Sequence, residues 1–155
     1  MSEPSMSEPL IWNETVREEW IDYNGHLSEG YYVVAFGFAT DALMIAIGMT
    51  PEYLAETGTS LFTVEAHVRY LDQILPGGEL EIRTSVIGVT GKSVWLWHEM
   101  WCEGKLRATE EVLLLHVDTE AGRAAEFPGP LREVLQEKLV PVPPEASRRI
   151  APRKA

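Results

Sequence analysis

An uninterrupted apolar stretch between Gly30 and Gly48 constrains the fold more than any other feature of the sequence. It reads YYVVAFGFATDALMIAI, and Asp41 is its only charged residue. The stretch is too long for a strand and is apolar on every side, so it predicts a buried helix. Gly48 can provide a left-handed C-terminal cap, and Pro51 prevents the helix from continuing.

A membrane-spanning helix is the alternative interpretation of this stretch. Against it, a carboxylate such as Asp41 costs about 2.5–3.5 kcal/mol at the middle of a bilayer on insertion scales. No Lys or Arg lies at either flank. The first residues contain neither a basic segment nor an apolar run, so they do not resemble a signal peptide. Because Cys102 is the only cysteine, no disulfide can form within the chain, and we expect a soluble, cytoplasmic protein without a membrane partner.

Segments of alternating polarity follow the helix, and short turns at 76–78, 90–92 and 103–105 separate them. Such short turns are typical of antiparallel strands that pair in chain order. In the first segment, alternation places Phe62, Val64, Ala66, Val68 and Tyr70 on one face and Thr63, Glu65, His67 and Arg69 on the other. The predicted strands are 60–71, 79–89, 93–103 and 106–118, with a short extended segment near 10–17 and a closing helix at 130–138.

An apolar helix followed by four long strands can bury itself if an antiparallel sheet curls around it. The other face of the sheet and its edges then need a cover, which a second copy of the chain can provide. We therefore expect an α+β protein with the hotdog architecture that forms a homodimer or a homotetramer. The domain is predicted over 10–140, after a flexible lead at 1–9 and before a flexible, Pro-rich and basic tail at 141–155.

The charge balance restricts the partners. The chain of 155 residues has 13 Lys and Arg against 24 Asp and Glu, a formal net charge of -11. Such a protein repels nucleic acid and anionic membranes, so neither is an expected partner. The same acidity suits a cationic ligand.

The candidate site is the loop Asp22-Tyr23-Asn24-Gly25-His26, directly before the predicted helix. The first turn of a helix presents free backbone N–H groups, which can hold a carbonyl oxygen and the oxyanion formed on attack. Asp22 would act there as a nucleophile or as a general base. Ser28 is the expected N-cap of the helix. A turn in which Asp22 or Asn24 only caps the helix explains the same residues without catalysis.

At these residues the chain resembles the hotdog thioesterases of the 4-hydroxybenzoyl-CoA thioesterase-like branch. Their signature is an Asp, two residues, a Gly, then often His-Val-Asn-Asn and a Tyr on the helix; here it reads DYNGHLSEGYY. The resemblance extends over about residues 16–122. It is closest to the betainyl-CoA thioesterase group associated with carnitine dehydrogenase, through EWIDYNGH, ATDAL, TVEAHVRYL and LLHVD.

The resemblance implies hydrolysis of a small acyl-CoA, such as betainyl-CoA, with coenzyme A entering as part of the substrate and no other cofactor. The family's catalytic Asp corresponds to Asp22, and its helix-start amides correspond to Leu27, Ser28 and Glu29. Ser28-Glu29 replaces the common Asn-Asn pair, so the roles of those asparagines do not carry over.

Further residues are candidates for the same site. His26 could be a base or a structural histidine bonded to the loop backbone. Glu65, His67 and Arg69 could form a solvated face, or could reach the Asp22 loop of a partner subunit. There Glu65 would be a second carboxylate, His67 would shape the pocket and Arg69 would anchor the ligand. Three tyrosines near Asp22 are expected to contact the acyl group; they are Tyr23, Tyr31 and Tyr32.

Three tryptophans of the third predicted strand, Trp95, Trp97 and Trp101, share one face with Glu99 between them. They indicate either a packed interface or an aromatic box for a quaternary ammonium group. The cations available for the CoA phosphates form no run; they are Arg69, Lys92, Lys105, Arg107 and Arg123.

Other chemistries remain open or are disfavoured. Cys102 lies in a strand and the chain has no Gly-x-Ser-x-Gly motif, which disfavours a Ser or Cys hydrolase. No His, Cys and Asp residues have metal-ligand spacing, so we expect no metal. Asp22, Asn24 and His26 would also permit a hydratase or dehydratase that acts on an enoyl or 3-hydroxyacyl thioester. A binding module without catalysis is the third alternative.

Overall fold

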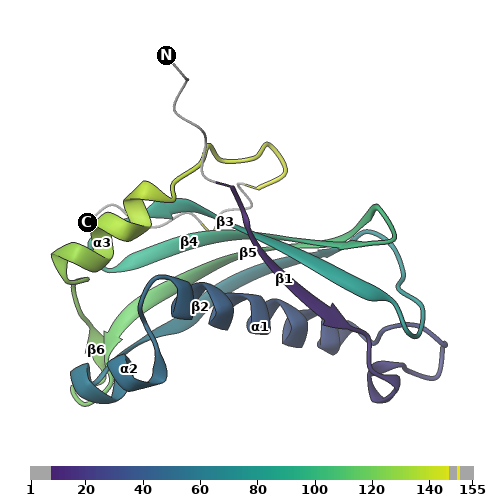
Figure 1. Cartoon of the computed structure of the whole chain (residues 1–155), viewed down its shortest axis with the longest axis horizontal. Helices are drawn as coiled ribbons and strands as arrows, with labels where there is room; N and C mark the ends of the chain where they lie inside the picture. The colour runs from purple at the N-terminus through teal and green to yellow at the C-terminus, as the bar shows by residue number, and fades with distance from the viewer. Residues whose placement is uncertain (1–7, 147–149, 151–155) are drawn as a thin grey trace.

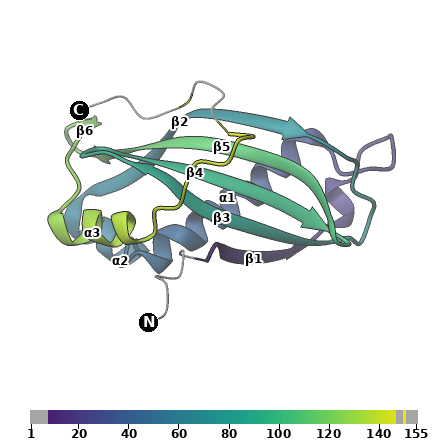
Figure 2. The same cartoon turned by 90° about the horizontal axis from the view of Figure 1, so that it is seen from above.

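The computed structural model describes residues 8–146 and 150. Its centre is a curved sheet with the strand order β1-β3-β4-β5-β2, to which β6 adds by pairing with β5 (Figures 1 and 2). All pairs are antiparallel. The strands are β1 Leu10–Thr15, β2 Thr59–Tyr70, β3 Glu79–Val89, β4 Ser93–Cys102, β5 Lys105–Asp118 and β6 Arg123–Ala124, and the helices are η1 Glu18–Trp20, α1 Glu29–Ala46, α2 Pro51–Thr57 and α3 Gly129–Glu137.

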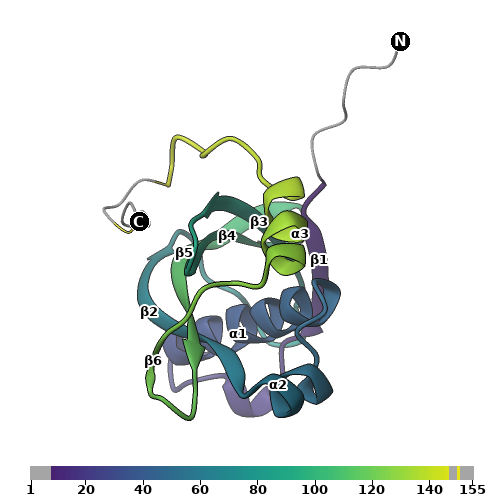
Figure 3. The same ribbon diagram turned by 90° about the vertical axis from the view of Figure 1, so that its left-hand side faces the viewer.

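Helix α1 lies across the concave face of the sheet, which confirms the predicted hotdog architecture (Figure 3). It buries Tyr32, Ala35, Phe36, Ala39 and Leu43 against the strands. Apolar burial of this kind stabilises a domain by roughly 25 cal/mol per Å².

The expected burial of α1 on all sides is wrong for a single chain. Val33 is 44% exposed and Ile45 is 57% exposed, because the sheet covers one side of the helix only. Within the described residues no single helix is long and apolar enough to cross a membrane. Helices α1 and α2 together meet the length and composition criteria, but they meet at a bend of 69°.

A bulge in β2 changes which side chains share a face. Thr63 lies opposite Leu114 of β5 and Glu65 lies opposite Leu113, so Val64 has no partner of its own in the register. An inserted residue reverses the alternation beyond it. The prediction that Phe62 shares a face with Ala66, Val68 and Tyr70 is therefore wrong, because Phe62 lies on the outer face. Beyond the bulge, Glu65, His67 and Arg69 also project outward, away from α1.

Helix α2 has clear local signals that the sequence interpretation missed. The Thr50 side chain accepts a hydrogen bond from the Tyr53 N–H at 3.2 Å, Pro51 occupies the first turn, and Gly58 ends the helix with a φ of 66°. An N-cap, an N-terminal Pro and a left-handed Gly together form a complete set of boundary signals. Pro51 therefore both ends the apolar stretch and begins a new helix.

The chain after α3 crosses the outer face of the sheet (Figure 2). The Val140 N–H donates to Val86 O at 3.0 Å, and Ala146 and Ile150 pack against Trp95 and Trp97. These contacts cover part of the face for which we expected a second copy. The expected flexible segments 1–9 and 141–155 lie partly outside the described residues.

Candidate active site

A tight hairpin before α1 presents Asp22. Ile21 and Leu27 form an isolated antiparallel bridge, and the Asp22 N–H donates to His26 O at 3.0 Å. The Gly25 N–H donates to Asp22 O at 2.9 Å, with Gly25 at a φ of 79°. Glycine adopts this left-handed conformation without the steric cost of a Cβ atom. The backbone of the loop therefore holds Asp22 in place.

The two carboxylate oxygens of Asp22 have different surroundings. Oδ1 accepts a hydrogen bond from the Asn24 N–H at 2.8 Å, which is the turn predicted as the non-catalytic alternative. Oδ2 has no hydrogen-bond partner among the described residues. One oxygen thus fixes the orientation of the carboxylate, and the other is free for a substrate or a water molecule.

The first turn of α1 supplies fewer free amides than the sequence suggests. Ser28 is the N-cap, as predicted, although its hydroxyl makes no capping bond. The Leu27 N–H donates to Ile74 O at 2.8 Å, and the Ser28 N–H donates to Trp20 O at 2.9 Å. Within the part of the chain that the structure describes, the amides of Glu29 and Gly30 have no acceptor. These two amides are the available oxyanion donors.

A cavity of about 600 Å³ opens beside this loop, a size typical of small-molecule sites. It joins the loop and the start of α1 to the segment that follows β2. It brings together most of the residues predicted for the site: Asp22, Tyr23, Asn24, His26, Leu27, Ser28, Glu29 and Tyr32. The imidazole of His26 makes no hydrogen bond within the described residues. It is therefore not a structural histidine bonded to the loop backbone.

Four predicted residues lie elsewhere. Tyr31 stacks on Trp20, with ring centroids 5.5 Å apart and planes 14° from parallel, so its ring is not part of the cavity wall. Glu65, His67 and Arg69 lie on the outer face of β2, outside the cavity of their own chain. Their expected contact with the Asp22 loop of a second copy stays a prediction.

The sequence interpretation missed the last residue of β2 and the segment after it, which form the opposite wall: Tyr70, Leu71, Asp72 and Gln73. The Tyr70 hydroxyl donates to Glu29 O at 3.3 Å, and its ring meets that of Tyr32 edge-on at 5.0 Å. Burial raises the pKa of Tyr32, so this phenol stays protonated near neutral pH. The alternation of β2 was the available signal, because it placed Tyr70 on the face that points toward the helix.

Two of the five candidate phosphate-binding cations contact Asp72, which lines this cavity. Lys105 forms an ion pair with Asp72, and Arg107 Nη1 lies 3.4 Å from Asp72 Oδ2. The hydrogen bond from Lys105 lowers the pKa of Asp72, so this carboxylate stays ionised and holds both cations. Arg123 lies in β6, and Lys92 O accepts a hydrogen bond from the His116 N–H of β5 at 2.7 Å. Strand β6 lies at the opposite end of the molecule from the loop that leads into α1 (Figure 1).

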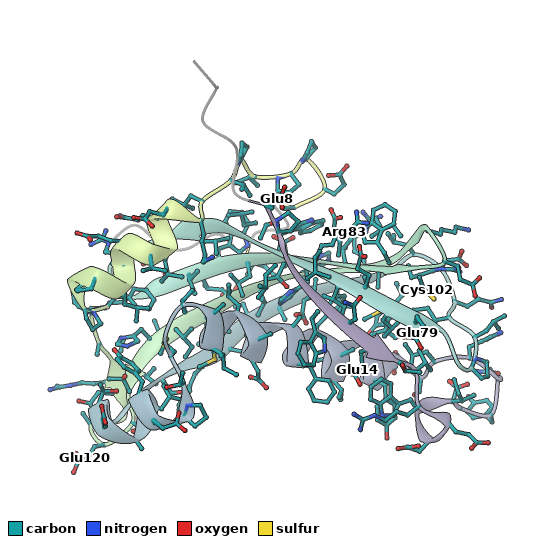
Figure 4. The ribbon with its side chains drawn as sticks, in the orientation of Figure 1. Glu8, Glu14, Glu79, Arg83, Cys102 and Glu120 are labelled. Carbon is teal, nitrogen blue, oxygen red and sulfur yellow. The ribbon has the colours of Figure 1, made fainter. Side chains whose placement is uncertain are left out.

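The tryptophan face supports the packing interpretation rather than an ammonium box. Trp97 and Trp101 donate to opposite oxygens of Glu99, each at 2.9 Å. The guanidinium of Arg83 lies 4.4 Å from the Trp101 ring centroid, so a cation of the protein already occupies that ring face. Figure 4 shows Arg83 on the side of the sheet opposite α1.

No group of three or more His, Cys, Asp or Glu side chains within the described ranges could hold a metal ion.

Comparisons with known proteins show the family of this chain. The family model of the thioesterase-like superfamily matches residues 16–147. The betainyl-CoA thioesterase of Pseudomonas aeruginosa is 38% identical over 151 residues, which cover 92% of this chain and 95% of that protein. An L-carnitine dehydrogenase/betainyl-CoA thioesterase of Agrobacterium fabrum is 42% identical over 129 residues, which are 82% of this chain and 26% of the longer protein.

Solved structures support the same assignment. A putative thioesterase of Pseudomonas putida KT2440 is 32% identical, with a TM-score of 0.73 over 94% of this chain and 92% of that chain. A hypothetical protein of Staphylococcus aureus in complex with CoA has a TM-score of 0.85 over 98% of this chain and all of that chain, and its 21% identity supports the fold alone. This chain belongs to the thioesterase-like superfamily and is a thioester hydrolase.

Proposed function

We propose that this chain hydrolyses betainyl-CoA, or a similar small cationic acyl-CoA, at the Asp22 cavity. The observation that carries the proposal is the free Oδ2 of Asp22 in the same cavity as the start of α1, where the amides of Glu29 and Gly30 are free. The substrate class is that of the relatives with 38% and 42% identity. The acidity of the chain, with a net charge of -11, is compatible with a cationic acyl group.

The geometry supports two versions of the same hydrolysis. As a general base, Asp22 removes a proton from water as the water oxygen attacks the thioester carbon; as a nucleophile, Asp22 attacks that carbon and water then cleaves the anhydride. In both versions the amides of Glu29 and Gly30 stabilise the oxyanion. Collapse of the tetrahedral intermediate breaks the C–S bond. The CoA thiolate leaves and takes up a proton.

Lys105 and Arg107 are our proposed contacts for the CoA phosphates, because Asp72 holds both beside the cavity. Charge-assisted bonds to phosphate are strong enough to position the cofactor portion of the substrate. Lys105 and Arg107 are two of the five cations that the sequence offered for this role. The free, buried thiol of Cys102 is compatible with the cytoplasmic location that we propose.

The unpaired edge of β2 supports a homodimer. Strand β2 ends the sheet, so one side of it has no strand partner among the described residues. Phe62 and Val64 of β2 are 52% and 48% exposed, and Val33 and Val34 of α1 are exposed as well. Long exposed edges are normally covered. We propose that two copies pair through β2; light scattering on the purified protein should give the mass of a dimer or of a tetramer built from dimers.

The proposed hydrolysis is tested by thiol release from a panel of acyl-CoAs, with wild-type protein and Asp22→Asn. Wild-type protein should release thiol from betainyl-CoA, and Asp22→Asn should not. Glu19→Gln, an exposed change three residues away, is the matched control and should behave as wild type. Full activity of Asp22→Asn would remove Asp22 from the mechanism, whereas loss of enoyl absorbance without thiol release would favour a hydratase.

A further inference from the structure

A buried histidine lies between α1 and the sheet, outside the mechanism described above. His98 is 0% exposed, and Phe36 stacks on its ring with centroids 5.5 Å apart. Its Nδ1 lies 2.7 Å from Thr84 Oγ1, and its Nε2 lies 2.9 Å from Thr40 Oγ1. Thr40 donates its own hydroxyl hydrogen to Phe36 O at 3.2 Å. Thr40 must therefore accept from His98, so the proton is on Nε2 and Thr84 donates to Nδ1.

This arrangement uses both nitrogens of a neutral imidazole. Burial lowers the pKa of His98 to about 3, so the ring carries no charge near neutral pH. His98 is directly opposite Glu110 in the register of β4 and β5, and Nε2 lies 3.8 Å from Glu110 Oε1. That separation exceeds a hydrogen bond. His98 is therefore a neighbour of Glu110 and not its counter-ion.

Glu110 is a buried carboxylate without a compensating partner. It is 4% exposed and lies in β5 on the α1 side, between the apolar Ala108 and Val112. No described residue forms a hydrogen bond with it. Burial raises its pKa to about 7. Burying such a group costs free energy that packing alone would avoid with an apolar residue, so a role in ligand binding is the simplest reason for it.

Glu110 lies close to Tyr70, which lines the cavity. In the register of β2 and β5, Glu110 is opposite Val68, and its neighbour Ala108 is opposite Tyr70. Both glutamate and tyrosine therefore project from the α1 side of the sheet, two residues apart along the strands. The carboxylate is close enough to Tyr70 to help raise the pKa of its phenol, after partial burial and Glu29. Tyr70 also lines the cavity that contains Asp22 and meets the Tyr32 ring there.

We propose that Glu110 selects a cationic acyl group, attracting the quaternary ammonium of a substrate whose thioester lies at Asp22. This inference rests on the proposed function and specifies its substrate class. A quaternary ammonium has no N–H group to donate. It binds through charge and aromatic faces, which a carboxylate without a hydrogen bond near Tyr70, whose ring meets that of Tyr32, can offer.

The test compares acyl-CoAs that differ in charge alone. In 3,3-dimethylbutyryl-CoA a carbon replaces the ammonium nitrogen of betainyl-CoA, and 5,5-dimethylhexanoyl-CoA matches 4-trimethylammoniobutyryl-CoA in the same way. Wild-type protein should prefer the cationic member of at least one pair by about tenfold or more in kcat/KM, a difference of roughly 1.4 kcal/mol. Glu110→Gln should lose that preference through KM and keep its activity on the neutral member.

Two controls keep the test decisive. Glu110→Asp retains the charge and should restore part of the preference. Glu81→Gln removes one negative charge from the outer face of β3 and should leave the preference unchanged. Equal turnover of both members of each pair by wild-type protein would overturn the role of Glu110 even if its variants fail to fold, while leaving the hydrolysis intact. No thiol release from any acyl-CoA would instead contradict the proposed function.

Discussion

Asp22 and Glu110 are carboxylates in opposite environments: Asp22 lines the cavity, whereas Glu110 is buried in β5. Asp22 lies in a half-exposed turn, where the Asn24 amide fixes one of its oxygens. Glu110 is 4% exposed and has no hydrogen bond from any described residue. The reactivity that we propose for Asp22 thus depends on its position beside the free amides of α1, whereas the protonation of Glu110 depends on burial. The following predictions test whether the role of Asp22 and the role of Glu110 can be changed independently.

The largest expected effect is on turnover. Asp22→Asn keeps an acceptor for the Asn24 N–H but cannot act as a base or a nucleophile, so kcat should fall by about 100-fold or more. The melting temperature should stay within a few degrees of wild type, since the turn is exposed. Steady-state thiol release and thermal unfolding measure both quantities. A large loss of stability would mean that Asp22 is mainly structural.

Glu110→Met should raise the stability of the protein while removing its preference for cationic substrates. Methionine has a similar length and no charge to bury, so at pH 8 the variant should gain about 1–3 kcal/mol in the free energy of unfolding. Urea unfolding at that pH measures the gain. The same protein should lose its preference for cationic acyl-CoA. A destabilised variant would show that the carboxylate has a structural partner in the folded protein.

The sequence predicted the main strands from their regular alternation and α1 from its long apolar stretch. It could not locate the bulge at Val64, since a single inserted residue leaves no compositional signal and is set by pairing with β5. Helix α2 was missed although Thr50, Pro51 and Gly58 mark its ends, because its seven residues have no apolar period.

The sequence likewise revealed only part of the candidate site. The Asp22 loop is contiguous in sequence, so one motif revealed most of its residues. Glu110 was not recognised, because Glu110 and Glu111 are adjacent in a strand and project to opposite faces that the sequence alone does not distinguish. Tyr70 and Asp72 reach the site through the course of β2, which only the folded sheet determines.

The pH dependence of stability should show two opposing contributions. His98 has a folded pKa of about 3, below its ordinary 6.5, so its contribution is complete above pH 6.5 and is lost as the pH falls toward 3. Glu110 has a folded pKa of about 7, above its ordinary 4.5, so its contribution is complete below pH 4.5 and is lost as the pH rises through 7.

These contributions oppose one another between about pH 4.5 and 6.5. In Glu110→Gln the opposing term is absent, so the free energy of unfolding should rise more steeply with pH across that window than in wild type, by roughly 1–3 kcal/mol in total. Urea titrations at closely spaced pH values measure the slope. Identical slopes for the two proteins would show that Glu110 does not titrate with a raised pKa.

The smallest effects are expected on the outer face of β2. Glu65 and His67 project away from α1 and are absent from the cavity that contains Asp22, so they can influence catalysis only from a partner subunit. If two copies pair edge to edge through β2, their sheets continue one another and the outer faces stay on the side opposite both helices. Glu65→Gln and His67→Gln should then change kcat/KM by less than about threefold, far below the effect of Asp22→Asn. A loss of about 100-fold in Glu65→Gln, with the dimer intact by light scattering, would mean that the copies pair differently and that Glu65 is a second carboxylate at the site.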